Sequence, residues 1–253
     1  MKKLFILLIL NFIVFFVNSQ NSCVTMLPDT GNAIKMIRTL DNKYVALALL
    51  NDSAYGGGVY NKLGLYKYNN QCVLEWAKYY TYEGTGQFSY LDFIQLENNN
   101  FAICGQLNWK PFIVLFNSSG DTIWIKRYDN YPVDNMFQNL VDMQEFSQIW
   151  LTGGGLPDHK AFVHKIDYYG NIVEVDSNQI TLPAGPSYTG NKMIKMNDSI
   201  LFTTGNGKYI ITDFSLFTYK TVQYSIQPLK VRKDPFGGYI IHDNAYYAPQ
   251  SGS

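Results

Sequence analysis

Several features on which protein function often depends are scarce in this sequence of 253 residues. Lys and Arg, 20 in total, are balanced by 20 Asp and Glu, so the formal net charge is zero. Charged residues make up only 16% of the chain. A nucleic-acid-binding surface would need a basic stripe, and an anionic lipid surface would attract a cluster of Lys and Arg. The charge balance therefore argues against nucleic acid and against a polybasic membrane patch.

Cysteine is also rare, with Cys23, Cys72 and Cys104 the only three. No CxxC pair is present, although structural zinc sites commonly contain one. The odd number argues against a disulfide framework, but Cys23 and Cys72 could pair in an oxidising compartment. The simpler interpretation is that all three are small apolar residues in strands or turns.

Motifs for catalysis or cofactor binding are missing as well. No Ser lies in a Gly-x-Ser-x-Gly elbow, and the glycine runs 56–58 and 153–155 lack the Gly-Lys-Ser/Thr of a phosphate loop. No calcium loop of the EF-hand type occurs. Of the three histidines, His159 is best explained as part of a solvated loop, and His164 is expected on the polar face of a strand. We therefore predict no catalytic residue, no cofactor and no metal site.

The only long apolar run lies at the N-terminus. Lys2 and Lys3 precede an apolar segment over 4–17, and small residues before Gln20 suit a cleavage site. The run is shorter than the roughly 20 residues that span a bilayer. No later segment is apolar enough to do so. We predict a signal peptide over 1–19 and an exported chain over 20–253, located outside the cell or on its outer surface.

What the sequence does have is a repeat. Asn69, Asn117, Asp167 and Asp213 recur at intervals of 46 to 50 residues, each in a polar turn between apolar runs. A period of this length with strand-like units is typical of propellers. The 16% aromatic content, including 20 Tyr, suits an all-β protein with many half-buried strand faces.

Each repeat contains two hairpins, and four short antiparallel strands make one propeller blade. We predict blades over 32–80, 91–129, 136–180 and 190–226, and a fifth that opens at 229. The fifth blade stops after its first hairpin. Either more blades follow Ser253, which we favour and which would make the chain a fragment, or residues 23–27 supply an outer strand that helps to complete the last blade.

In the two clearest repeats the turn is followed by Trp-x-Lys, at Trp76 and Lys78 and again at Trp124 and Lys126. Aromatic residues at one repeat position can stack between neighbouring blades and bury large areas. We predict this structural role for both pairs.

The segment 117–128, Asn-Ser-Ser-Gly-Asp-Thr-Ile-Trp-Ile-Lys-Arg-Tyr, resembles the repeats of secreted bacterial β-propellers of the type found in bacteria with type IX secretion. Residues 167–171 are the next best match, and the end of the N-terminal segment at Ser19 and Gln20 is similar too. The resemblance covers about residues 22–247. It implies a propeller and export but no activity, because the matching residues are structural.

Tyrosines in the expected loops are the best hint to a ligand. Loops on a rigid scaffold often hold binding sites, and Tyr offers contact area with a polar tip at low entropy cost. The candidate ligand-binding residues are Tyr55, Tyr60, Tyr82, Tyr131, Tyr188 and Tyr246, with Tyr90 and Tyr247 near them. Such a surface could bind a glycan or a protein, unless Tyr is simply abundant in this chain.

Three functions remain open at this stage. The favoured one is a non-catalytic binding, adhesion or scaffold module. The alternative is an enzyme that acts on extracellular polysaccharide through carboxylates at a central pore, for which Asp142 and Asp198 are candidates. The third is a structural spacer within a larger secreted protein.

Overall fold

The computed structural model describes residues 27–29, 31–50, 61–81, 86–129, 136–155, 160–176, 192–196, 198–203, 208–215, 218–223, 228–233 and 239–243. Within them the chain forms five antiparallel sheets in which sequential strands are neighbours. The first is β1 (Gly31–Arg38), β2 (Tyr44–Leu50), β3 (Lys62–Tyr68) and β4 (Leu74–Thr81). The second is β5 (Phe88–Gln95), β6 (Phe101–Leu107), β7 (Lys110–Phe116) and β8 (Thr122–Arg127).

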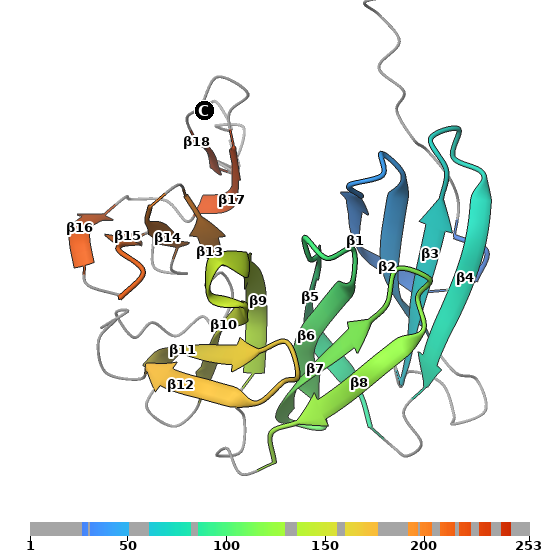
Figure 1. Cartoon of the computed structure of the whole chain (residues 1–253), viewed down its shortest axis with the longest axis horizontal. Coiled ribbons are helices and arrows are strands. Elements are labelled where there is room, and N and C mark those ends of the chain that lie inside the picture. The colour runs from blue at the N-terminus through green and yellow to red at the C-terminus, as the bar shows by residue number, and fades with distance from the viewer. Residues whose placement is uncertain are drawn as a thin grey trace, which may run out of the picture.

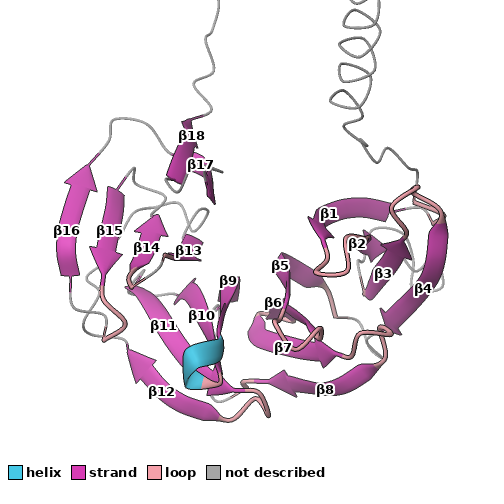
Figure 2. Cartoon of the chain, turned by 45° about the horizontal axis from the view of Figure 1, so that its top comes forward, coloured by secondary structure: helices cyan, strands magenta, loops and turns pink. Residues whose placement is uncertain are grey.

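The third sheet is β9 (Met136–Met143), β10 (Gln148–Gly155), β11 (Lys160–Asp167) and β12 (Ile172–Asp176), with the 3-10 turn η2 (Gln144–Phe146) between β9 and β10. The fourth is β13 (Lys192–Lys195), β14 (Ile200–Thr203), β15 (Lys208–Thr212) and β16 (Thr218–Gln223). The fifth pairs β17 (Pro228–Lys233) with β18 (Tyr239–Asp243). The sheets follow one another around an open arc, with β1, β5, β9 and β13 on its inner side (Figures 1 and 2). The predicted all-β propeller with four-stranded blades is confirmed.

The core lies between blades rather than within one central cluster. One apolar cluster joins the first and second blades, another the second and third, and another the third and fourth. Both faces of a middle blade are therefore covered. This is why strands such as β6 are buried along their whole length and read as apolar runs without alternation.

The first strand of each blade presents a large apolar side chain to the preceding blade. Phe93, Leu140 and Met193 fill this position in the second, third and fourth blades and are almost fully buried. Met36 fills it in the first blade and is 42% exposed. The difference arises because no described sheet lies against this side of the first blade (Figure 2).

The repeated Asn or Asp of the sequence builds the turn before the last strand of each blade. Asn117 Oδ1 accepts hydrogen bonds from the backbone N–H groups of Ser119 and Asp121, both at 2.9 Å. Asn69 and Asp167 accept the same pair of bonds in their own blades. A side chain that closes its own turn in this way favours Asn and Asp, which explains the period seen in the sequence.

Each clear Trp-x-Lys unit packs on the turn of the next blade. Trp76 and Lys78 lie against Gly120, and the Lys78 ammonium contacts Asp121 at 2.7 Å. Trp124 and Lys126 repeat the arrangement on the following blade. They lie against Gly170, Lys126 Nζ donates to Asn171 Oδ1, and Trp124 Nε1 donates to the Tyr168 carbonyl. The predicted packing role of these four residues is confirmed.

The third blade lacks this unit, because Glu174 stands at the Trp position, where it pairs with Lys165. Its interface with the fourth blade is built differently. Phe146 stacks on Trp150 and meets the Phe214 ring edge-on, while the Lys195 ammonium pairs with Glu145. Local substitutions in one repeat thus change how two blades are joined while the four-stranded unit is kept.

The cysteines only partly match the simpler interpretation. Cys104 is a buried free thiol, and burial raises its pKa. Cys72, however, is disulfide-bonded, which corrects the expectation that all three cysteines are plain apolar residues. Cys23 lies outside the described residues, as does the predicted signal peptide. Among the described residues, no helix is long and apolar enough to cross a membrane.

The expectation that His164 lies on a polar strand face is wrong. Its side chain is 1% exposed and meets the Phe137 ring edge-on, with ring centroids 5.4 Å apart. Neighbouring blades cover both faces of β11, with Ile166 packed on one side and Val163 on the other, so neither face of this strand is a polar surface. Burial lowers the pKa of His164 from its usual 6.5 to about 4.

This lowered pKa predicts a pH-dependent stability. Between pH 6.5 and pH 4 the unfolded chain binds a proton at His164 that the folded chain does not, so stability present above pH 6.5 is lost as the pH falls. The expected loss from this group is up to about 3 kcal/mol at pH 4. Urea denaturation at pH 7 and pH 4 would measure it, with His164→Phe as control. An equal loss in that variant would assign the effect to other groups.

Candidate functional site

The described strand ends define one end of the propeller at which the blades are connected. In each four-stranded blade the first and third strands start at this end and the second strand ends there. The blade-to-blade connections therefore also begin and end there, and we call this end the connection face. Six tyrosines are predicted as ligand-binding residues, and each belongs to a segment that joins or follows described strand ends. These residues themselves lie outside the described part of the chain: Tyr55, Tyr60, Tyr82, Tyr131, Tyr188 and Tyr246.

Trp109 and Tyr90 lie close together on the connection face. Trp109 is 65% exposed and Tyr90 is 43% exposed. Together they line a hollow of about 190 Å³, whose other walls are three amide side chains and one hydroxyl: Gln87, Gln106, Asn108 and Ser89. None of the six lining residues is charged.

Trp109 stands at an unusual place in the hairpin between β6 and β7. The two-residue turn is Asn108-Trp109, and both residues have positive φ, 51° and 63°. Two positive φ values characterise a type I′ turn, where Asn followed by Gly is preferred. A Trp at the Gly position carries backbone strain, and its exposure means that it gains little burial there. Strain of this kind is concentrated at functional sites.

Tyr90 reaches the hollow through a bulge in β5. Ser89 pairs with Gln106 and Asp92 pairs with Cys104, so β5 has an irregularity between these two positions. Tyr90 has a φ of 53°. Bulges re-aim side chains and are over-represented near active sites. Here the bulge turns Tyr90 toward solvent, whereas Leu91 packs against the core.

Hydrogen bonds hold the two walls of the hollow together. The backbone N–H of Gln87 donates to Asn108 Oδ1 at 3.2 Å, and the Asn108 N–H donates to the Gln87 carbonyl at 3.3 Å. Ser89 Oγ donates to Gln106 Oε1 at 3.0 Å. The start of β5 is thus tied to the Trp109 hairpin, which makes the hollow a preformed feature.

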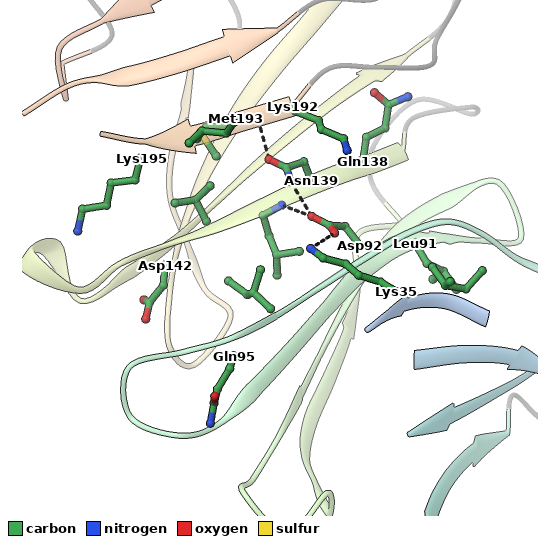
Figure 3. A pocket seen from close by; sticks show the side chains of 15 residues that line it. Lys35, Leu91, Asp92, Gln95, Gln138, Asn139, Asp142, Lys192, Met193 and Lys195 are labelled. Carbon is green, nitrogen blue, oxygen red and sulfur yellow. Dashed lines mark hydrogen bonds and ion pairs between the residues drawn. The ribbon is translucent and has the colours of Figure 1, made fainter. Parts of the chain in front are cut away.

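A second, larger concavity of about 760 Å³ lies along the inner strands (Figure 3). Lys35, Asp92 and Asn139 occupy the same register position of β1, β5 and β9. The Lys35 ammonium lies 2.7 Å from Asp92 Oδ1, and Asn139 Nδ2 donates to Asp92 Oδ2 at 2.6 Å. Asn139 Oδ1 in turn accepts from the Met193 N–H of β13 at 2.7 Å. We call these contacts the inner polar ladder.

The carboxylates of this concavity are held by protein groups. Asp142 accepts from the Glu97 N–H at 2.8 Å and from the Tyr168 hydroxyl at 2.6 Å. Burial and this bond to Asp142 raise the pKa of Tyr168. Asp198, the other candidate for an enzyme, does not line the concavity. Within the described residues, no group of three or more His, Cys, Asp and Glu is placed to hold a metal ion.

Comparison with known proteins shows the fold. The chain superposes on the Dos1 propeller with a TM-score of 0.57 and 10% identity, over 87% of this chain and 56% of that one. It superposes on the Pan2 WD40 domain of Neurospora crassa with a TM-score of 0.51 and 13% identity, over 87% and 63%. A Bacteroides caccae protein of unknown function gives a TM-score of 0.47 and 12% identity, over 74% and 62%. The chain thus spans 56% to 63% of the lengths of these structures.

No protein-family model and no curated protein matches the sequence. The structural neighbours are propellers, so this part of the sequence-based resemblance holds. Membership among secreted repeats of the type IX kind stays a prediction.

Sequence reasoning missed Trp109 as a site residue. A signal was available, since Asn-Trp between two apolar runs stands where a hairpin would usually carry Asn-Gly. It also missed the inner polar ladder. The sequence signal for the inner polar ladder was a polar residue at the same position of the first strand in successive repeats, namely Lys35, Asp92 and Asn139.

Proposed function

We propose that this chain is an exported, non-catalytic binding or adhesion module whose ligand contacts the connection face. The observation that carries the proposal is Trp109, a two-thirds exposed aromatic residue in a strained turn beside Tyr90. Exposed aromatic side chains around a polar hollow supply contact area and orientation for a ligand. The Tyr residues that the sequence predicts as ligand-binding would enlarge this surface.

Export is supported by two features. The segment 1–19 has the layout of a signal peptide, and Cys72 is disulfide-bonded. Disulfides persist mainly in oxidising compartments outside the cytoplasm.

The enzyme alternative gains no support from the inner concavity. A carboxylate that acts as a general acid or base must reach the proton that it transfers. Asp92 and Asp142 are instead engaged by neighbouring blades. These contacts favour a structural role for both.

A direct binding assay tests the proposal. The purified chain would be passed over two immobilised panels, one of extracellular polysaccharides and one of secreted proteins, together with Trp109→Gly and Tyr169→Ala. Tyr169 is 76% exposed in the turn between β11 and β12, at the opposite end of the propeller, so Tyr169→Ala is a matched control. We expect binding to one panel that Trp109→Gly weakens at least tenfold and Tyr169→Ala leaves unchanged. No binding to either panel, or equal losses in both variants, would refute the proposal.

A further inference from the structure

We propose that the hollow at Trp109 binds a neutral pyranose unit of an extracellular glycan. This inference rests on the proposed binding function and names its ligand class. It depends on three properties of the hollow, which are its aromatic wall, its uncharged polar lining and its size.

The aromatic wall suits the apolar face of a sugar ring. One face of a pyranose presents a group of C–H bonds whose hydrogens are slightly positive, and the face of an indole or phenol ring is negative. Trp109 and Tyr90 offer such rings to solvent, being 65% and 43% exposed. Because their backbones are held in the hairpin and the bulge, little ordering is needed on binding.

The remaining lining suits sugar hydroxyl groups. Gln87, Gln106 and Asn108 carry amide groups and Ser89 a hydroxyl. Ser89 Oγ donates to Gln106 Oε1 and the Gln87 N–H donates to Asn108 Oδ1, but a hydroxyl or carbonyl oxygen can accept a further bond, so the lining can still pair with sugar hydroxyls. A sugar hydroxyl can both donate and accept. Phosphate, sulfate or carboxylate groups would instead be favoured by Arg or Lys, and none lines the hollow. The chemistry therefore favours a neutral sugar over a sulfated sugar or a uronic acid.

The size of the hollow matches one ring of a longer chain. Its volume of about 190 Å³ is below the roughly 300 Å³ at which pockets for drug-sized molecules begin. A single shallow subsite with few contacts gives weak binding, with a Kd on the order of 1 mM for one sugar unit. Useful affinity would come from several subsites along the connection face or from several copies of the protein.

The hairpin turn provides an unusually clean test. Trp109→Gly places the preferred Asn-Gly pair in a type I′ turn, so the variant is expected to melt at the same temperature as the parent or higher. It nevertheless removes the larger of the two aromatic platforms. Loss of binding in this variant therefore cannot be attributed to loss of folding.

The experiment is calorimetric titration of the full exported chain with neutral hexasaccharides of glucose, mannose, galactose and N-acetylglucosamine, and with a hexasaccharide of a uronic acid. We expect at least one neutral series to bind. Its affinity should fall at least tenfold in Trp109→Gly, recover in part in Trp109→Phe, and stay unchanged in Tyr169→Ala. Thermal melting of each variant accompanies the titrations.

The outcomes separate this inference from the proposed function. Binding restricted to the uronic acid, or neutral-sugar binding that Trp109→Gly does not weaken, overturns the assignment of the hollow. If no glycan binds but a secreted protein binds in a Trp109-dependent way, the glycan inference fails and the proposed function stands. If neither a glycan nor a secreted protein binds, both the glycan inference and the proposed function fail.

Discussion

Replacing Asp92 with Ala is expected to lower the free energy of unfolding by about 3 kcal/mol. Asp92 is 8% exposed and connects three blades through its two carboxylate oxygens. Asp92 Oδ1 forms an ion pair with the Lys35 ammonium. Asp92 Oδ2 accepts hydrogen bonds from Asn139 Nδ2 and, at 3.4 Å, from the Leu140 N–H. Leu140 lies on β9, the inner edge strand of the third blade, and Asp92 provides an acceptor for the Leu140 backbone N–H. Removal leaves buried donors without an acceptor, which is costly.

Urea denaturation would measure this loss against two graded controls. Asp92→Asn keeps an acceptor oxygen and should cost about 1 kcal/mol. Lys35→Met removes a side chain that is 37% exposed, and such partly exposed pairs contribute no more than about 1 kcal/mol. We expect Asp92→Ala to lower the free energy of unfolding most and Asp92→Asn less. Lys35→Met should lower it by the same amount as Asp92→Asn or by less. If Lys35→Met destabilised the protein as much as Asp92→Ala, the ion pair with Lys35 rather than the hydrogen bonds to Asn139 and Leu140 would be the main contribution of Asp92.

Replacing Gly120 with Ala is expected to cost about 2–3 kcal/mol, through two separable effects. Gly120 has a φ of 80°, where a Cβ costs about 1 kcal/mol. The new Cβ would also lie 2.8 Å from the Trp76 ring and 2.9 Å from Lys78 Cγ. Forcing a packed interface apart costs about 1–3 kcal/mol.

A double-mutant cycle separates the two effects. In a Trp76→Ala background the contacts with the Trp76 ring are gone and the partly exposed Lys78 side chain has room to shift, so Gly120→Ala should then cost little more than about 1 kcal/mol for the backbone. The first blade shows that a residue with a Cβ can adopt this backbone conformation, because Cys72 occupies the position equivalent to Gly120 with a φ of 63°. If Gly120→Ala cost the same with and without Trp76, the requirement for Gly would come from the backbone alone.

Much of the fold could be predicted because its signals are local. Asn117 closes its own turn with two backbone N–H groups four residues away at most, so the turn leaves a mark that repeats in the sequence. The apolar runs of β6 and β7 likewise reveal strands buried on both faces. The Trp-x-Lys unit was interpreted correctly because an aromatic residue that recurs in a repeat has few roles other than packing.

The predicted tyrosine site stays a prediction, because its residues lie outside the described part of the chain. The described hollow depends on Trp109 and Tyr90, of which only Tyr90 was singled out. Their meeting requires the bulge in β5 and its register against β6, and a bulge has no reliable local signature in one sequence.

The sequence by itself therefore determined the four-stranded repeat and its turns, since these depend on side chains that bond to their own neighbours and on apolar runs long enough to span a blade. Tertiary structure alone decided that His164 is buried, that Asp92 joins three blades, and that Trp76 packs on the turn at Gly120. These properties depend on which surfaces face each other across a blade interface. That relation joins residues 43 to 57 positions apart in the hydrogen bonds and ion pairs between blades described above, and it is set by packing and register rather than by local preference.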